Sequence, residues 1–157
     1  MKVFITGGSG FLGINLIRAL KRKGIKDIQV LDIAEFDCPE KNEIQFIKGD
    51  VRNSEALALV IKGADVVIHA AAALPLYSKE EIYTTDIEGT KNLLEAAHIH
   101  GVQRVIHISS TAVYAFPTII PFTRMISWKE WAPTVRPRSR RRRHERNIAR
   151  RAYVLPC

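Results

Sequence analysis

Short apolar runs and amphipathic stretches alternate along the first 114 residues. The apolar runs are rich in β-branched and aromatic residues, which predicts buried strands at residues 2–7, 27–33, 43–50, 64–72 and 102–110. Apolar residues at helical spacing predict helices at residues 11–24, 54–63 and 78–101, the last of which can bend at Gly89. Strands separated by helices imply right-handed crossovers. We therefore predict an α/β fold with a doubly wound, Rossmann-like parallel sheet.

This alternation stops after Tyr114. Residues 115–157 contain five prolines and an arginine run at 140–143, and they show neither a strand period nor a helix period. Residues 1–114 carry 13 Lys and Arg against 14 Asp and Glu, whereas residues 115–157 carry 11 against 2. We expect one domain over residues 1–114, with a sheet that is incomplete at its C-terminal end, followed by an irregular, disordered basic tail over residues 115–157.

Composition and charge narrow the classes of protein further. The net charge of +8 would normally point to nucleic acid, but the arginine-rich segment has no aromatic residues for stacking on bases, so we do not expect a nucleic-acid partner. The two cysteines offer no metal-ligand spacing. The first apolar run is broken by glycines after four residues, and no run reaches the roughly 20 residues that span a bilayer. We expect a cytoplasmic protein without a metal or a membrane segment.

The sequence TGGSGFLG joins the first predicted strand to the first predicted helix and places Gly7, Gly10 and Gly13 at G-x-x-G-x-x-G spacing. Gly7 permits a tight turn, Gly10 leaves room for a pyrophosphate, and Gly13 lets the helix pack closely on the strand. The start of the helix then offers unpaired N–H groups to the phosphates. The spacing predicts a dinucleotide site; the alternative is a glycine-rich turn without a ligand.

Two carboxylates follow the next two predicted strands. Asp32 ends the second strand, 19 residues after Gly13, where it can accept both hydroxyls of an adenosine ribose and would repel a 2′-phosphate. This favours NAD over NADP; the alternative is a capping or solvated turn residue. In GDVRN, Asp50 and Val51 stand where the edge of an adenine could be held, although an ordinary turn explains the same residues.

Together with HAAA at residues 69–72, DIEGTKNLLEAA at 86–97 and SSTAVY at 109–114, these motifs resemble the extended short-chain dehydrogenase/reductase family, the NAD-dependent epimerase/dehydratases that act on nucleotide sugars. The resemblance covers residues 1–114 and implies NAD as cofactor and a nucleotide sugar as substrate. Asp86 stands where the family pattern usually has Asn. The resemblance implies the following cofactor-binding residues: Gly7, Gly10, Phe11, Leu12, Gly13, Asp32, Asp50, Val51, Ala70, Ala71 and Ala72.

The family's chemistry needs three groups beside the cofactor. Hydride passes from a sugar carbon to NAD while a Tyr phenolate, activated by a Lys four residues later, takes the hydroxyl proton and a Ser or Thr polarises the reacting oxygen. Ser110, four residues before Tyr114, matches this Ser or Thr; the alternative is a strand-end serine bonded to the backbone. The Tyr–Lys pair is absent, because the last lysine is Lys129 and the only tyrosine after Tyr114 is Tyr153.

A shifted reading frame accounts for both the missing pair and the basic tail. If one G was lost after the Tyr114 codon, AFPTIIPFT can be restored to GIPDHHPIY, and residues 131–140 can be restored to GPYGEAKVE. The second segment contains the expected Tyr and Lys at the family distance. Glutamate codons read one base out of register become arginine codons, which explains the charge.

Three hypotheses remain. The first is the NAD-binding part of a nucleotide-sugar epimerase/dehydratase that is inactive as this truncated chain. The second is a small NAD-binding regulatory module with a basic arm for nucleic acid. The third, a complete enzyme with Tyr114 as its base, lacks a suitably spaced lysine. Because the family often dimerises through helices that include the one bearing the Tyr–Lys pair, we do not expect this chain to form a homodimer.

Overall fold

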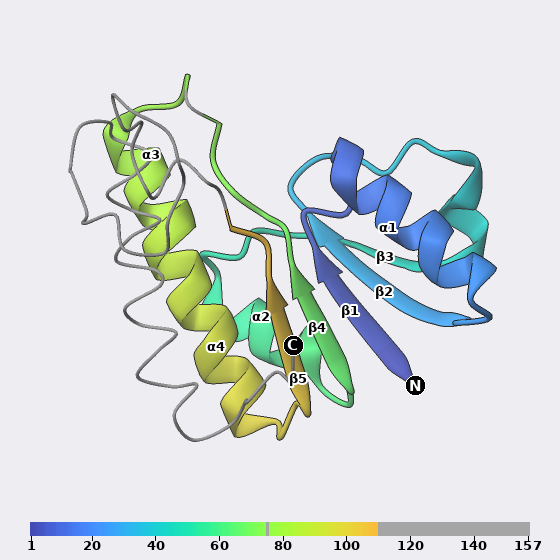
Figure 1. Ribbon diagram of the computed structural model, residues 1–157. Helices are drawn as coiled ribbons and strands as arrows, with labels where there is room; N and C mark the ends of the chain where they lie inside the picture. The colour runs from blue at the N-terminus through green and yellow to red at the C-terminus, as the bar shows by residue number, and fades with distance from the viewer. Residues whose placement is uncertain (75, 110–157) are drawn as a thin grey trace, which may run out of the picture.

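A parallel five-stranded sheet forms the centre of the computed structural model, which describes residues 1–74 and 76–109 (Figure 1). The strand order is β3-β2-β1-β4-β5, and all neighbouring strands are parallel. The chain builds outward from β1 in one direction and then in the other, which confirms the doubly wound, Rossmann-like sheet. The strands are β1 (Lys2–Thr6), β2 (Asp27–Asp32), β3 (Gln45–Lys48), β4 (Val66–His69) and β5 (Arg104–His107).

Helices cover both faces of this sheet. Helix α1 (Phe11–Arg22) lies on one face, and α2 (Ser54–Ile61) and α4 (Thr90–Ile99) lie on the other (Figure 1). A short helix α3 (Lys79–Tyr83) and a π-helical segment η2 (Thr84–Gly89) lead directly into α4. A 3₁₀ turn η1 (Pro39–Glu43) precedes β3. None of the described helices combines the length and the apolar character that a membrane span requires.

Side chains that alternate along the strands pack into two separate hydrophobic cores, one on each face of the sheet. On the α1 face, Ile5, Ile17 and Val30 are fully buried. On the other face, Phe4 of β1 packs in the same cluster as Leu57 of α2 and Leu93 of α4. Because the central strands β1, β2 and β4 are buried on both faces, they read in the sequence as largely continuous apolar runs, whereas the edge strands β3 and β5 are partly exposed.

Several elements differ from the sequence prediction: β3 and β5 are shorter than predicted, and the turn η1 was not predicted. The fourth strand was predicted to reach residue 72, but β4 ends at His69. The Ala70 N–H group still bonds to the Thr6 carbonyl of β1, whereas the Ala73 N–H group bonds to the side chain of Asp86 at 2.9 Å. The chain therefore leaves the sheet after His69. The predicted helix at 78–101 contains the π-helical segment η2, which ends at Gly89, the residue at which a bend was expected.

The lack of a side chain at Gly89 lets the segment formed by η2 and α4 pack closely against the turn after β3. A Cβ atom at Gly89 would lie 2.6 Å from Cγ2 of Val51, in the turn after β3. The absence of a side chain allows the end of η2 to pack directly against this turn. The predicted tail at 115–157, with Ser110 and Tyr114, lies outside the described residues.

Candidate cofactor-binding site

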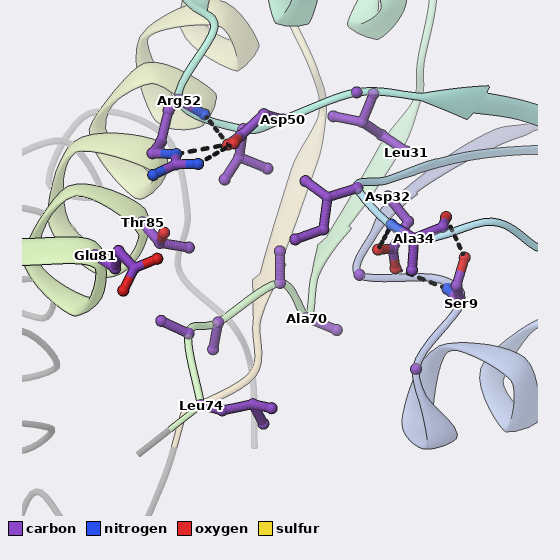
Figure 2. Close-up of a pocket in the computed structure, with 18 of the residues that line it drawn as sticks. Ser9, Leu31, Asp32, Ala34, Asp50, Arg52, Ala70, Leu74, Glu81 and Thr85 are labelled. Atoms are coloured by element: carbon purple, nitrogen blue, oxygen red, sulfur yellow. Dashed lines mark hydrogen bonds and ion pairs between the residues drawn. The ribbon is translucent and has the colours of Figure 1, made fainter. Parts of the chain in front are cut away.

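The loops that follow four parallel strands surround a cleft of about 480 Å³. The cleft lies where β1 is flanked by β2 on one side and by β4 on the other, the position at which open α/β sheets bind ligands. Figure 2 shows side chains from these loops and from the α3–η2 segment around one open space. The cleft is lined by Gly7, Ser9, Gly10, Leu31–Ala34, Gly49–Arg52, Ala70–Leu74, Tyr77, Glu81 and Thr85.

Three glycines of the first loop have different structural roles. Gly7 has a φ of 74°, and a Cβ atom there would lie 2.6 Å from the backbone nitrogen of Ala71. A Cβ atom on Gly13 would lie 2.4 Å from the Gly7 carbonyl oxygen. Gly10 has more room, because its nearest neighbour would be that same oxygen at 3.5 Å. Gly7 and Gly13 are therefore required by the packing of the loop, whereas Gly10 keeps the cleft open.

Helix α1 begins directly after Gly10 and has no side-chain cap at its N-terminus. Its first N–H groups are available to an anion at this point. Phe11 is 88% exposed and Leu12 is partly exposed in the first turn of the helix. Of the glycine-loop residues predicted to bind the cofactor, Gly7 and Gly10 line the cleft, while Phe11, Leu12 and Gly13 lie in α1 beside it.

The carboxylate of Asp32 lies at the end of β2 and is held by two backbone groups. The Ser9 N–H group donates to Oδ2 at 2.8 Å, and the Ala34 N–H group donates to Oδ1 at 3.0 Å. Ser9 also donates its hydroxyl to the Ala34 carbonyl oxygen at 3.3 Å. These contacts fix the orientation of an acceptor that lines the cleft (Figure 2). Each carboxylate oxygen keeps capacity for a further donor.

Asp50, in the turn after β3, forms an ion pair with Arg52. Its Oδ2 atom accepts hydrogen bonds from Nε and Nη2 of Arg52 at 2.8 and 2.5 Å, and its Oδ1 atom accepts the Arg52 backbone N–H group at 2.9 Å. Burial acts to raise the pKa of Asp50, but together the hydrogen bonds from Arg52 outweigh it and hold that pKa below its ordinary value. Asp50 and Val51 both line the cleft, and their contact with the edge of an adenine stays a prediction.

The loop formed by residues 70–73 lies on a buried hydrogen-bond network. Thr90 donates its hydroxyl to the Asp86 carbonyl oxygen at 2.8 Å and also contacts Nε2 of His69 at 3.0 Å, so this histidine nitrogen is the donor. The Nδ1 atom of His69 then accepts the Thr6 hydroxyl at 2.6 Å, and the Thr6 oxygen faces the Ala71 N–H group at 3.5 Å. The network supports a structural role for His69.

Asp86 shows the consequence of a departure from the family pattern. Its Oδ1 atom accepts the Ala73 N–H group, but its buried Oδ2 atom has no hydrogen-bond partner among the described residues. An asparagine would keep the accepting oxygen and replace the unpartnered one with a donor. Asp86 therefore anchors the loop by one of its two oxygens.

Sequence reasoning did not identify the side chains that close the far side of the cleft. Tyr77 precedes α3 and also lines the cleft. Glu81 lies in α3 and Thr85 in η2, and Arg52 comes from the turn after β3 (Figure 2). A helical period could not show that the first turns of a predicted helix face a pocket formed by distant strands. Ser110, the predicted catalytic residue, is outside the described part of the chain, so its position relative to the cleft stays a prediction.

Comparisons with known proteins agree with this geometry. The model of the NAD dependent epimerase/dehydratase family matches residues 3–143. A 3-beta-hydroxysteroid dehydrogenase of Mycolicibacterium neoaurum is 32% identical over 120 residues, which are 71% of this chain and 32% of that protein. The decarboxylating sterol-4-alpha-carboxylate 3-dehydrogenase of Mus musculus is 36% identical over 114 residues, 71% of this chain and 30% of the other.

A solved structure of MoeE5 in complex with UDP-glucose and NAD is similar with a TM-score of 0.82 and 26% identity, covering 96% of this chain and 50% of MoeE5. The chain thus spans about a third of the length of these two curated relatives and half of this solved protein. The chain belongs to the NAD-dependent epimerase/dehydratase family, whose cofactor is NAD.

Proposed function

We propose that this chain is the NAD-binding part of an enzyme that moves hydride between a secondary alcohol carbon and NAD. The observation that carries the proposal is the carboxylate of Asp32, which is fixed by Ser9 and Ala34 at the rim of the cleft. A carboxylate in this position accepts the two hydroxyls of an adenosine ribose and repels a 2′-phosphate.

The other predicted residues fit the remaining parts of the dinucleotide. The open position at Gly10 and the uncapped start of α1 would hold the pyrophosphate, next to Phe11 and Leu12. Asp50 and Val51 would hold the adenine edge, and the backbone of Ala70, Ala71 and Ala72 would form the floor between the two halves of the cofactor. When bound, NAD supplies the hydride acceptor.

We propose a nucleotide sugar as the substrate, in agreement with the sequence motifs and with a solved relative that holds UDP-glucose. A 3-hydroxysteroid is the second candidate, because the two curated relatives described above are named as steroid and sterol 3-dehydrogenases. Both substrates present a secondary alcohol, so the chemistry required at the cofactor is the same. The difference lies in what holds the rest of the molecule.

We further propose that the hydroxyl of Ser110 polarises the reacting oxygen and that the Tyr–Lys pair was displaced by a lost base after the Tyr114 codon. A polypeptide of these 157 residues then lacks the phenolate that takes the proton as hydride leaves. General-base catalysis is typically worth about 10² to 10⁴ in rate. We therefore expect this polypeptide to bind cofactor without turning over substrate.

The test compares the 157-residue chain with the product of the same gene carrying one G inserted at the Ala115 codon. Each protein is incubated with NAD and either UDP-glucose, dTDP-glucose or a 3β-hydroxysteroid. We expect sugar turnover only from the restored protein and a strong loss of it in Ser110→Ala. Net NADH formation on the steroid would select the second candidate instead. Sugar turnover by the 157-residue chain that survives Ser110→Ala would contradict both the catalytic role and the inactive-chain proposal.

A further inference from the structure

The hydrogen bonds from Arg52 limit how many further donors the carboxylate of Asp50 can accept. Both oxygens of a carboxylate together offer about four acceptor directions. The two directions of Oδ2 are taken by Nε and Nη2 of Arg52, and one direction of Oδ1 is taken by the Arg52 backbone N–H group. About one acceptor direction therefore remains, on Oδ1.

The backbone of this turn is fixed independently of the Arg52 side chain. Asn92 of α4 donates to the Arg52 carbonyl oxygen at 3.0 Å, and Asn53 caps α2 by accepting the Ala56 N–H group at 3.0 Å. Val51 packs against Gly89, where there is no room for a side chain. The turn thus keeps its place when the guanidinium is removed, whereas the carboxylate of Asp50 loses both hydrogen bonds to Oδ2 and is held only by the backbone N–H group of residue 52 at Oδ1.

Glu81 is the other carboxylate on this side of the cleft, and it is already engaged. Its Oε2 atom accepts the Ser78 N–H group at 2.9 Å and the Ser78 hydroxyl at 2.7 Å. Figure 2 shows the Arg52 guanidinium bonded to Asp50, with Glu81 on the neighbouring helix. The Arg52 guanidinium therefore orients the carboxylate of Asp50 and not that of Glu81.

The neighbouring backbone supplies the opposite polarity. The Val51 N–H group has no hydrogen-bond partner among the described residues, and Val51 lines the same cleft. One remaining acceptor on Asp50 and one donor on Val51 match the edge of a 6-aminopurine, which presents an N–H donor at its exocyclic group and an acceptor at N1. A 6-oxopurine presents the reverse at both positions.

We propose that Arg52 is a positioning residue that makes the cleft select a 6-aminopurine dinucleotide over its 6-oxo analogue, by holding Asp50 as an acceptor aimed at the exocyclic group. This inference rests on the proposed binding of NAD. It assigns the discrimination to the Arg52 side chain, not to Asp50 alone.

The experiment measures the dissociation constants of NAD and of nicotinamide hypoxanthine dinucleotide by isothermal titration calorimetry with the full chain. A hydrogen bond to a charged group supports a preference for NAD of about 10- to 100-fold in the unmodified protein. We expect Arg52→Ala to reduce this ratio to about threefold or less, and Arg52→Lys, which cannot donate two parallel bonds, to give an intermediate ratio. Arg22→Ala, an exposed arginine in the last turn of α1, should leave the ratio unchanged.

Circular dichroism and thermal unfolding of each variant show whether it is folded before titration. An Arg52→Ala protein that loses affinity for both dinucleotides by the same factor would overturn the proposal, since that pattern indicates a merely structural role. An unchanged ratio would overturn it as well. If the unmodified chain binds NAD but does not discriminate, this inference fails while the proposed function stands; if it binds neither dinucleotide, the proposed function fails first.

Asp50→Asn gives an independent check. An amide can present a donor to the 6-oxo group, so this variant should bring the ratio of the two dissociation constants close to one.

Discussion

The backbone N–H group of Ser9 donates a 2.8 Å hydrogen bond to the carboxylate of Asp32. Ser9 lies in the glycine loop after β1, and Asp32 ends β2, so this bond joins the loop proposed to hold the pyrophosphate to the residue proposed to hold the ribose. The two subsites are therefore one rigid unit. Changes in the glycine loop should therefore alter the position of the Asp32 carboxylate.

Replacing glycines of the first loop should separate folding from binding. Gly10→Ala should change the free energy of unfolding by less than about 1 kcal/mol, because its φ of −75° suits alanine and its Cβ atom would meet only ordinary contacts. It should nevertheless weaken NAD binding, since the new methyl group lies where the pyrophosphate would approach. Urea unfolding and NAD titration of the same protein measure the two effects.

Gly13→Ala is the matched control for this prediction. Its Cβ atom would lie 2.4 Å from backbone atoms of Gly7 and Gly8, so the loop itself must move. Forcing atoms into a packed region costs about 1–3 kcal/mol or more, and we expect at least that loss in the free energy of unfolding. Equal stability losses in the two variants would show that Gly10 has a packing role and would remove it from the phosphate site.

Gln29 on β2 should be replaceable with a gain in stability. It is 3% exposed, and its Oε1 atom has no hydrogen-bond partner among the described residues. An unpartnered buried polar group costs about 1–3 kcal/mol, so Gln29→Met, which keeps the shape of the side chain, should raise the free energy of unfolding by about 1 kcal/mol. Gln45→Met, at an exposed position of β3, should stay within about 0.5 kcal/mol. A loss of stability in Gln29→Met would show that this amide is hydrogen-bonded after all.

The ion pair of Asp50 and Arg52 should make a small, pH-dependent contribution to stability. The folded protein holds the pKa of Asp50 below its ordinary value of 3.8, so the unfolded chain binds a proton more readily and the contribution is present above that value. It is lost as the pH falls through the lower, folded pKa. Since both side chains are partly exposed, Arg52→Ala should cost no more than about 1 kcal/mol at neutral pH. Urea unfolding at pH 7 and below pH 3 should show the difference shrinking; a difference that grows on acidification would contradict this sign.

The strands and their order of appearance were predictable because a sheet covered on both faces needs continuous apolar runs, and these runs are visible in the sequence. Ile5, Val30 and Val67 illustrate this, since all three are buried where the apolar pattern placed them. The Gly7 turn was also predictable, because its φ of 74° is a conformation that glycine adopts readily.

The contacts between loops were not predictable in the same way. Nothing in a local pattern shows that the Asp86 side chain takes the Ala73 N–H group and so draws residues 70–74 out of the sheet. The turn that carries Asp50 and Arg52 is likewise held by Asn92, which donates to the Arg52 carbonyl oxygen from forty positions away along the chain. Such contacts determine the shape of the cleft, and they form only when distant segments meet.

The most direct test of the account is the relative affinity of the unmodified chain for NAD and NADP. We predict saturable binding of NAD and binding of NADP that is weaker by about tenfold or more, because the fixed Asp32 carboxylate repels a 2′-phosphate. Asp32→Ala should weaken NAD binding and bring the two affinities together, whereas Asp27→Ala, an exposed aspartate at the opposite end of β2, should change neither. Equal affinity for the two cofactors in the unmodified chain, or an unchanged preference in Asp32→Ala, would contradict the central claim that this cleft is an NAD site organised by Asp32.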